Sequence, residues 1–351
     1  MTDTGYDCIE QALQGRSCSR IPCFPLIDAA FASAYSGYNL RAVQTDPAKH
    51  AEALGRCARE LPVDGVYINL SLSRKQAASG DAAQVIIDNA VAISIPENDV
   101  LSISATEISD LSDPRIRSAE LFHPGMLETY RLITEDIKQE YAVVTGLTGT
   151  FSQLAFLFGV QNLLIELLDR PEQVRRALEQ RHVTVMDQVD ELCAAGVRFA
   201  WIGEGLGSGS LISPEQYREF VLPYEQDIAR RFRERGVLTL LHICGNIKNS
   251  LDFIARSGVD GIDLDYPVPI EAAFNALGSE TSVKGNINPG LFLPGHAAEL
   301  TEACRTVLER ADGHPGFIMS TGCLVPRDST EEAFHIMRTE CNDYTKEPKN
   351  G

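Results

Sequence analysis

The sequence predicts an α/β fold, and within that class a (β/α)8 TIM barrel. Short apolar segments rich in β-branched residues alternate with longer amphipathic segments, a pattern typical of parallel strands covered by helices. The 351 residues suffice for such a barrel, which needs roughly 250 residues plus insertions. No linker divides the chain, so we expect residues 1–351 to form a single elaborated domain, with a doubly wound α/β sheet as the alternative.

Eight segments have the short apolar pattern that is expected of strands. They are residues 21–27, 65–70, 141–146, 197–203, 237–243, 261–264, 281–285 and 316–320. Residues 71–140 are too many for one crossover between neighbouring strands. They contain the apolar runs 92–95 and 100–103 on either side of Pro96-Glu97-Asn98-Asp99, so we expect an inserted hairpin or helical segment after the second strand.

Amphipathic segments between the strands predict helices, and several have recognisable start signals. Pro47 lies in the first turn of one helix, behind Thr45 or Asp46 as N-cap, and Ser213 with Gln216 has the spacing of a capping box. The expected helices are residues 45–61, 170–195, 213–235, 250–257 and 299–311.

Charge and hydropathy exclude two classes of partner. Lys and Arg number 31 against 49 Asp and Glu, a formal net charge of −18, and such a field repels the phosphate backbone of nucleic acids. No apolar run reaches the roughly 18–20 residues that cross a bilayer. The acidic first seven residues do not resemble a signal peptide, so we expect a cytoplasmic protein with neither nucleic-acid nor membrane partners.

The nine cysteines do not suggest a disulfide framework, because their number is odd and they are scattered through a long chain. Without an export signal, reduced thiols are expected. A cysteine in a distinctive setting is therefore a candidate metal ligand or catalytic residue. Seven of the nine lie in no such setting and are expected to have no special role, namely Cys8, Cys18, Cys23, Cys57, Cys193, Cys304 and Cys341.

His242 and Cys244 form the strongest local motif. They are two residues apart at the end of the fifth expected strand, so both side chains point to the same side. The carboxyl ends of barrel strands are where reactive groups lie, and an imidazole with a thiolate suits zinc. The alternative is a half-buried histidine that donates to a backbone carbonyl, beside an inert buried cysteine.

Cys323 strengthens the metal hypothesis. It directly follows the eighth expected strand, so it reaches the same end of the barrel as His242 and Cys244. Three N and S ligands from two strands, with a further position open, match a catalytic zinc site. Taken alone, Cys323 is equally well explained as a small buried hydrophobic residue.

Polar residues at the ends of three further strands are candidate catalytic residues. Glu204 follows the fourth strand among glycines, and we expect it either to handle a proton or to serve as a displaceable fourth zinc ligand; a helix-cap or loop acid is the alternative. Asp263 and Asp265 share one face of the sixth strand, where carboxylates could orient a histidine ligand or a substrate cation. Asn286 offers an amide donor at the end of the seventh strand.

Together these motifs resemble the uroporphyrinogen decarboxylase superfamily, and within it the zinc-dependent, corrinoid-linked methyltransferases. The resemblance extends over residues 22–337 and is most specific from Glu204 onward. The segments that carry it are His242-x-Cys244-Gly245-Asn246, Gly285-Asn286-x-x-Pro289, Gly322-Cys323-x-x-Pro326 and the stretch from Gly209 to Tyr224.

The resemblance implies a barrel that holds zinc through His242, Cys244 and Cys323. It also implies transfer of a methyl group between a corrinoid, usually carried as cobalamin by a separate protein, and a small thiol such as coenzyme M. Two alternatives stay open within the superfamily: an O-demethylase-type reaction that moves methyl from a methyl ether onto Co(I) corrinoid, and transfer from methyl-corrinoid to tetrahydrofolate.

Decarboxylation of uroporphyrinogen is less favoured. The decarboxylase proper has an arginine-rich loop after its first strand, which holds the substrate carboxylates. This chain has no arginine between Arg20 and Arg41. An acidic protein without that clamp is poorly suited to a substrate that carries many carboxylates.

Overall fold

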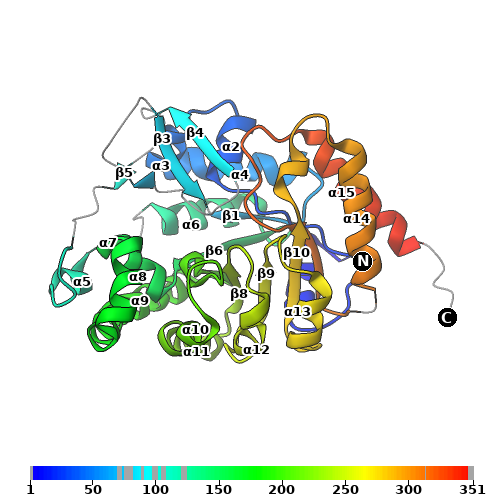
Figure 1. The fold of residues 1–351 in the computed structure, drawn as a ribbon. Helices are drawn as coiled ribbons and strands as arrows, with labels where there is room; N and C mark the ends of the chain where they lie inside the picture. The colour runs from blue at the N-terminus through cyan, green and yellow to red at the C-terminus, as the bar shows by residue number, and fades with distance from the viewer. Residues whose placement is uncertain are drawn as a thin grey trace.

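The computed structural model describes residues 3–68, 108–119, 125–312 and 314–346, together with the backbone of four short strands between residues 73 and 103. Its centre is a curled sheet of seven strands in the order β1-β6-β7-β8-β9-β10-β11 (Figure 1). Every neighbouring pair in this sheet is parallel. The strands are β1 Gly65–Ile68, β6 Ala142–Thr148, β7 Phe199–Gly203, β8 Leu238–Ile243, β9 Gly261–Leu264, β10 Ser282–Ile287 and β11 Phe317–Thr321.

Residues 22–27 lie between the two edge strands and close the barrel. The sequence predicts a strand here, but the structure has only isolated bridges at Cys23 and Leu26. Pro22 and Pro25 have no N–H, so a continuous ladder is not possible. The backbone still bonds to both edges: Phe24 N to Met319 O (2.8 Å) and Val325 N to Leu26 O (3.0 Å) on the β11 side, and Asp64 N to Cys23 O (2.8 Å) and Tyr67 N to Ile27 O (3.1 Å) on the β1 side.

Seven of the eight expected strands are therefore present, with bounds shifted by at most three residues; residues 69 and 70 of the second lie outside the described part. The arrangement confirms an α/β barrel with a parallel sheet. Helices cover the outside of the strands (Figure 1). They are α1 Gly5–Leu13, α2 Ala29–Tyr35, α3 Leu40–Thr45, α4 Pro47–Glu60, α5 Arg115–Ser118, α6 Met126–Ile137, α7 Thr150–Phe158, α8 Val160–Asp169, α9 Pro171–Ala194, α10 Pro214–Phe220, α11 Leu222–Glu234, α12 Leu251–Ile254, α13 Ile270–Leu277, α14 Ala297–Arg310 and α15 Glu331–Lys346.

The long helix predicted over residues 213–235 is wrong in one respect, because α10 and α11 are separate helices. The chain bends at Val221, and Pro223 lies in the first turn of α11. A proline nitrogen cannot donate the hydrogen bond that a continuous helix needs at this position. The predicted capping box is present, since Ser213 and Gln216 bond to each other's backbone at the start of α10.

In the insertion after β1, the predicted run 92–95 pairs with a different strand from the predicted one, and the inserted hairpin stays a prediction. β4 (Val91–Pro96) pairs antiparallel with β3 (Ala82–Ile87), and β5 (Ser102–Ile103) pairs in parallel with β2 (Ser73–Arg74). β3 contains Val85, Ile86 and Ile87, whose branched side chains favour strand. The remaining insertion residues up to 107 lie outside the described part of the chain.

Helix α1 packs against the N-terminal end of the barrel. Its residues Ile9 and Leu13 belong to a buried cluster with Phe199, Leu240 and Ile318, which are contributed by β7, β8 and β11. The interior of the barrel is therefore apolar at this end. Among the described residues no single helix is long and apolar enough to cross a membrane; α7 and α8 meet such a criterion only as a pair bent by 106°.

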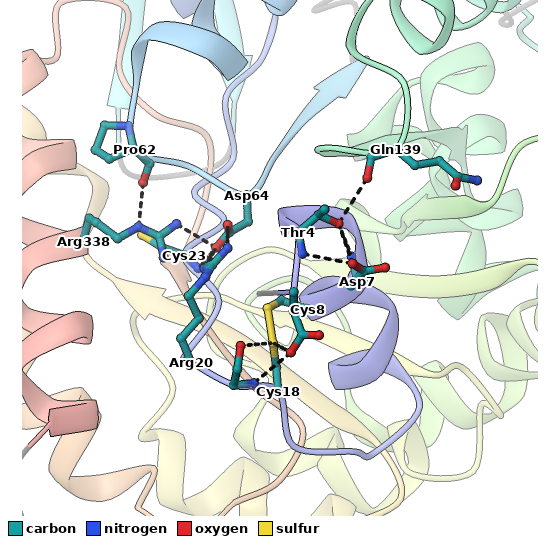
Figure 2. Close-up of polar contacts among 12 residues, drawn as sticks. Thr4, Asp7, Cys8, Cys18, Arg20, Cys23, Pro62, Asp64, Gln139 and Arg338 are labelled. Carbon is teal, nitrogen blue, oxygen red and sulfur yellow. Dashed lines mark hydrogen bonds and ion pairs between the residues drawn. A yellow bond between two sulfur atoms is a disulfide. The ribbon is translucent and has the colours of Figure 1, made fainter. Parts of the chain in front are cut away.

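Cys8 and Cys18 form a disulfide, which corrects the expectation that all nine cysteines are reduced (Figure 2). Cys8 lies in α1, and Cys18 lies in the segment that leads from α1 to the closing segment, with the two Cα atoms 5.2 Å apart. The absence of an export signal and the odd number of cysteines gave no sign of this pair. It forms because the chain turns back directly after α1 and brings Cys18 next to Cys8.

Asp64, immediately before β1, holds the closing segment in place (Figure 2). The side chain is 2% exposed. Its Oδ2 accepts from Arg20 Nη1 at 2.7 Å, from Cys23 N at 2.6 Å and from Arg338 Nη2 at 2.7 Å. Burial alone would raise the pKa of Asp64, but the two guanidinium groups outweigh it and lower the pKa below 3.8. One carboxylate thus joins β1, the closing segment and α15.

We predict that Asp64→Asn lowers the free energy of unfolding by about 3 kcal/mol at pH 7, as expected when one partner of a buried ion pair is removed. Because the pKa of Asp64 is lower in the folded state, its contribution is complete above the unfolded value near 3.8 and is lost as the pH falls through the folded value. Urea unfolding at several pH values measures both effects.

The matched control is Asp136→Asn. Asp136 pairs with Arg59 on the surface, where both side chains are about half exposed. Its loss should cost at most about 0.5 kcal/mol. Equal destabilisation by the two variants would contradict the role of Asp64.

Candidate metal centre

His242, Cys244 and Cys323 come together at the carboxyl end of the barrel strands. His242 lies in β8, Cys244 directly follows β8, and Cys323 follows β11. His242 Nε2 is 2.9 Å from Cys244 Sγ and 3.8 Å from Cys323 Sγ. One ligand atom from each residue lies within 4.8 Å of the others. The same-side placement that the sequence predicts for His242 and Cys244 is therefore present.

A backbone carbonyl fixes the orientation of the His242 ring. His242 Nδ1 is 2.9 Å from the carbonyl oxygen of Asp263 in β9. A carbonyl can only accept, so Nδ1 carries a hydrogen and Nε2 is the nitrogen that faces the two sulfurs. This is the usual arrangement for a metal-binding histidine. The donation to a carbonyl that the alternative explanation predicts is therefore present, and it leaves Nε2 facing the sulfurs, as the metal hypothesis requires.

The three side chains are electrostatically matched to one another. The hydrogen bond from Cys244 lowers the pKa of Cys323 to about 6, and the contact with His242 acts in the same direction. Burial works to lower the pKa of His242, but the Cys323 thiolate outweighs burial and raises it to about 10. Cys323 is therefore a thiolate at neutral pH, which is the form that binds metal. One nitrogen and two sulfur donors at this separation fit zinc.

Asp265 and Asn286 shape the loops that carry the cysteines. Asp265 Oδ2 accepts from Gly245 N, next to Cys244, at 2.6 Å. Asn286 Nδ2 donates to the carbonyl oxygens of Asp265 (3.2 Å) and Val268 (2.7 Å). Asp265 therefore supports the Cys244 loop, while the histidine is oriented by the carbonyl of Asp263. The catalytic roles of Asp265 and Asn286 stay predictions.

Gly322, before Cys323, permits a close approach to this loop. A Cβ atom at Gly322 would lie 2.4 Å from the backbone nitrogen of Tyr266. Real Cβ atoms do not come so close to backbone, so a larger residue would push the Cys323 loop away from His242.

Glu204 is not brought together with the three ligand atoms. It follows β7 and is 1% exposed, and its Oε1 accepts from Ser152 N, in the first turn of α7, at 2.7 Å. A Cβ atom at Gly149 would lie 2.0 Å from Glu204 Oε2, so glycine makes room for the carboxylate. Burial raises the pKa of Glu204 to about 7. The carboxylate of Glu204 thus accepts from the first turn of α7, as the helix-cap alternative predicts. Its role as a fourth zinc ligand stays a prediction.

Behind Glu204 lie two further buried polar side chains that the sequence argument missed. Tyr217 of α10 donates to Glu225 Oε2 of α11, and both residues are fully buried. Burial raises the pKa of Glu225 well above its ordinary value, and the charge of Glu204 acts in the same direction. No sequence signal marks Glu225, since an acidic residue in the first turn of a helix is ordinary.

Comparison with known proteins shows which proteins the chain is similar to. The family described as Uroporphyrinogen decarboxylase (URO-D) matches residues 4–344. Uroporphyrinogen decarboxylase of Carboxydothermus hydrogenoformans is 23% identical over 248 residues, 67% of this chain and 68% of that protein. Methylcobamide:CoM methyltransferase MtbA of Methanosarcina acetivorans is 28% identical over 199 residues, 56% of this chain and 57% of that protein.

Another relative is the methylated-thiol–coenzyme M methyltransferase of Methanosarcina mazei, 28% identical over 57% of this chain and 53% of that protein. The chain thus spans little more than half the length of these two methyltransferases. Among solved structures, a methyltransferase from Methanosarcina mazei shares the fold, with a TM-score of 0.79, 16% identity, and coverage of 97% of this chain and 99% of that one.

We predict one zinc ion per chain, bound through His242, Cys244 and Cys323. Removing one ligand by Cys323→Ala should weaken zinc binding by more than the roughly 10–100-fold loss that follows an outer-shell change. Metal analysis after dialysis and X-ray absorption measure this. Cys193→Ala, at a half-buried thiol of α9 outside the group, is the control and should keep its zinc. An absorption spectrum with only oxygen neighbours would contradict the site.

Proposed function

Because the chain belongs to the uroporphyrinogen decarboxylase family, we propose that it is a zinc-dependent methyltransferase that moves a methyl group between a corrinoid and a small thiol such as coenzyme M. The observation that carries the proposal is the group of His242, Cys244 and Cys323 at the carboxyl end of the barrel. Relatives that act as methylcobamide:CoM methyltransferases support it. The corrinoid is proposed to arrive on a separate carrier protein.

The charge of the ligand set favours a thiol as the methyl acceptor. A zinc ion bound at this site would lower the pKa of a substrate thiol that reaches it. A bound zinc would displace the extra proton that the raised pKa leaves on His242, and Cys244 and Cys323 as thiolates would then balance its two positive charges. Such electron-rich surroundings preserve the nucleophilicity of a bound thiolate. An ether oxygen needs stronger polarisation, so O-demethylation is the second candidate, and transfer to tetrahydrofolate the third.

The contacts of Arg20 argue against uroporphyrinogen decarboxylation. Arg20 lies just before the closing segment, and its guanidinium is bound to the buried carboxylate of Asp64. The next arginine along the chain is Arg41. Arg41 follows the N-cap of α3 and is exposed. The closing segment therefore offers no guanidinium for the carboxylates of a porphyrinogen.

We predict that the zinc-loaded protein transfers methyl from methylcobalamin to coenzyme M or a related thiol. Loss of the Co–CH3 absorption measures turnover. Cys323→Ala should reduce the rate by at least about 100-fold, since a metal ligand is removed, whereas Cys193→Ala should not. Methyl loss to a folate or from a methoxylated aromatic, with no thiol turnover, would overturn the choice of acceptor.

The binding step gives an independent check. Binding of the thiol should release about one proton per chain near pH 7, because the thiol binds as thiolate. A pH indicator in weakly buffered solution detects this release. A thiol that binds and keeps its proton would contradict the proposed activation.

Glu204 is proposed as a catalytic residue. Since its carboxylate bonds to Ser152 N and not to the metal ligand group, we predict that Glu204→Gln keeps about one zinc per chain. We expect methyl transfer to fall at least about 100-fold, the lower end of the range for loss of a general acid or base. Zinc loss in this variant would instead favour Glu204 as a fourth ligand, and full activity would exclude it from catalysis.

A further inference from the structure

A buried ion pair lies inside the barrel, on the strands next to the metal ligands. Lys284 of β10 donates through Nζ to Asp263 Oδ1 of β9 at 2.6 Å and to Ser320 Oγ of β11 at 2.6 Å. Lys284, Asp263 and Ser320 are all 0% exposed. One ammonium group thus joins the strands on both sides of its own. From the sequence, Lys284 is only one residue of the expected strand 281–285.

Every charged atom of this pair has a partner. Lys284 Nζ lies 5.3 Å from the centre of the Phe24 ring and 5.1 Å from that of Tyr67, so the aromatic faces stabilise its remaining charge. Tyr67 Oη donates to the second oxygen of Asp263 at 3.3 Å. The hydroxyl of Ser320, which accepts from Lys284, donates to the carbonyl of Thr321 at 2.9 Å. The network is complete, as a buried polar group requires.

Both partners of Lys284 are connected to a metal ligand, one by a hydrogen bond and the other along the chain. Asp263 provides the backbone carbonyl that accepts the hydrogen of His242 Nδ1, and the two residues are paired in register across β8 and β9. Ser320 lies three residues before Cys323 on β11. The ammonium group therefore links the strand that orients the histidine to the strand that delivers the distal cysteine.

Stability alone does not account for this arrangement. Replacing a buried ion pair by apolar residues of similar size is often neutral or stabilising. The other end of this barrel is filled in that way, by Ile9, Leu13 and Leu240. A charged pair among apolar residues costs desolvation, and what it adds is directional bonds to particular strands.

We propose that Lys284 is a positioning residue for the metal centre, holding Asp263 and Ser320 so that His242 and Cys323 face each other at ligand distance. The inference rests on the proposed zinc-dependent function and names the residue that fixes the geometry of its ligand set. The hydrogen bonds described for Lys284 go to Asp263 and Ser320 and not to the three ligand atoms, and its side chain is fully buried. It acts through the backbone of β9 and through the start of the Cys323 loop.

The test uses Co2+ as the metal probe, added to the full-length metal-free protein. The visible d–d and thiolate charge-transfer bands report coordination geometry, and their titration reports affinity. Two variants are compared with the unsubstituted chain: Lys284→Met, and Lys284→Met combined with Asp263→Asn. The double variant removes both charges and keeps the carbonyl of residue 263, so the buried carboxylate is no longer unpaired.

We expect Lys284→Met to lower the thermal midpoint, because Asp263 loses its counter-charge. The double variant should regain much of that stability. In both variants Co2+ affinity should fall by roughly 10–100-fold, with altered band intensities, as for a change in the shell that orients ligands. If Lys284→Met does not fold, the double variant and Ser320→Ala, which removes one acceptor, carry the test; a smaller loss of affinity is expected for Ser320→Ala.

Arg338→Met is the matched control. It removes another mostly buried cation, which pairs with Asp64 and contacts no metal ligand. It should lower the thermal midpoint and leave the Co2+ spectrum and affinity unchanged. A stable double variant with unaltered Co2+ bands and affinity would overturn the positioning role. Failure of the unsubstituted chain to bind Co2+ or zinc would instead overturn the proposed metal site itself.

Discussion

Closure of the parallel sheet by residues 22–27 is the constraint on which the candidate centre depends. His242 lies in β8 and Cys323 follows β11, and these two strands have β9 and β10 between them in the sheet. They face each other because the sheet curls until its edges meet on the closing segment. The ion pairs of Asp64 with Arg20 and Arg338 stabilise this closure. This ionic contact adds stability to the closed sheet, whereas the strands and the loops that follow them carry the metal ligands.

The strand order of the barrel could be predicted from the sequence wherever local pattern and tertiary role agree. The strand Gly261–Leu264 is found with the predicted bounds, since a short apolar run between turn residues has no competing conformation. Prediction failed where one residue type overrides the pattern. Pro22 and Pro25 interrupt an otherwise apolar segment, and Pro223 divides an otherwise periodic helix. The partner of β4 was also missed, because pairing depends on contacts between segments and not on local composition.

The sequence predicted that the three candidate ligands would come together, but it did not predict the contacts that support them. Spacing along one strand places His242 and Cys244 together, and a shared barrel end adds Cys323. The carboxylate of Glu204 turns instead to Ser152, a residue of another strand–helix connection, and no spacing rule could reveal this. Lys284 was overlooked for a similar reason: a lysine is normally exposed, and only the fold shows the ring of partners that makes burial tolerable.

The contacts that close the barrel join residues far apart in the sequence, and this determines when they can form during synthesis. Leu26 N bonds to Thr321 Oγ1 across 295 residues of sequence, and Cys323 meets His242 across 81. During synthesis the amino-terminal segment has no β11 to pair with until almost the whole chain has left the ribosome. Contacts between residues so far apart in the sequence form late and slowly. The three candidate ligands therefore come together only after β11 and Cys323 have been translated, and a nascent chain that ends before Cys323 contains only His242 and Cys244 of the group.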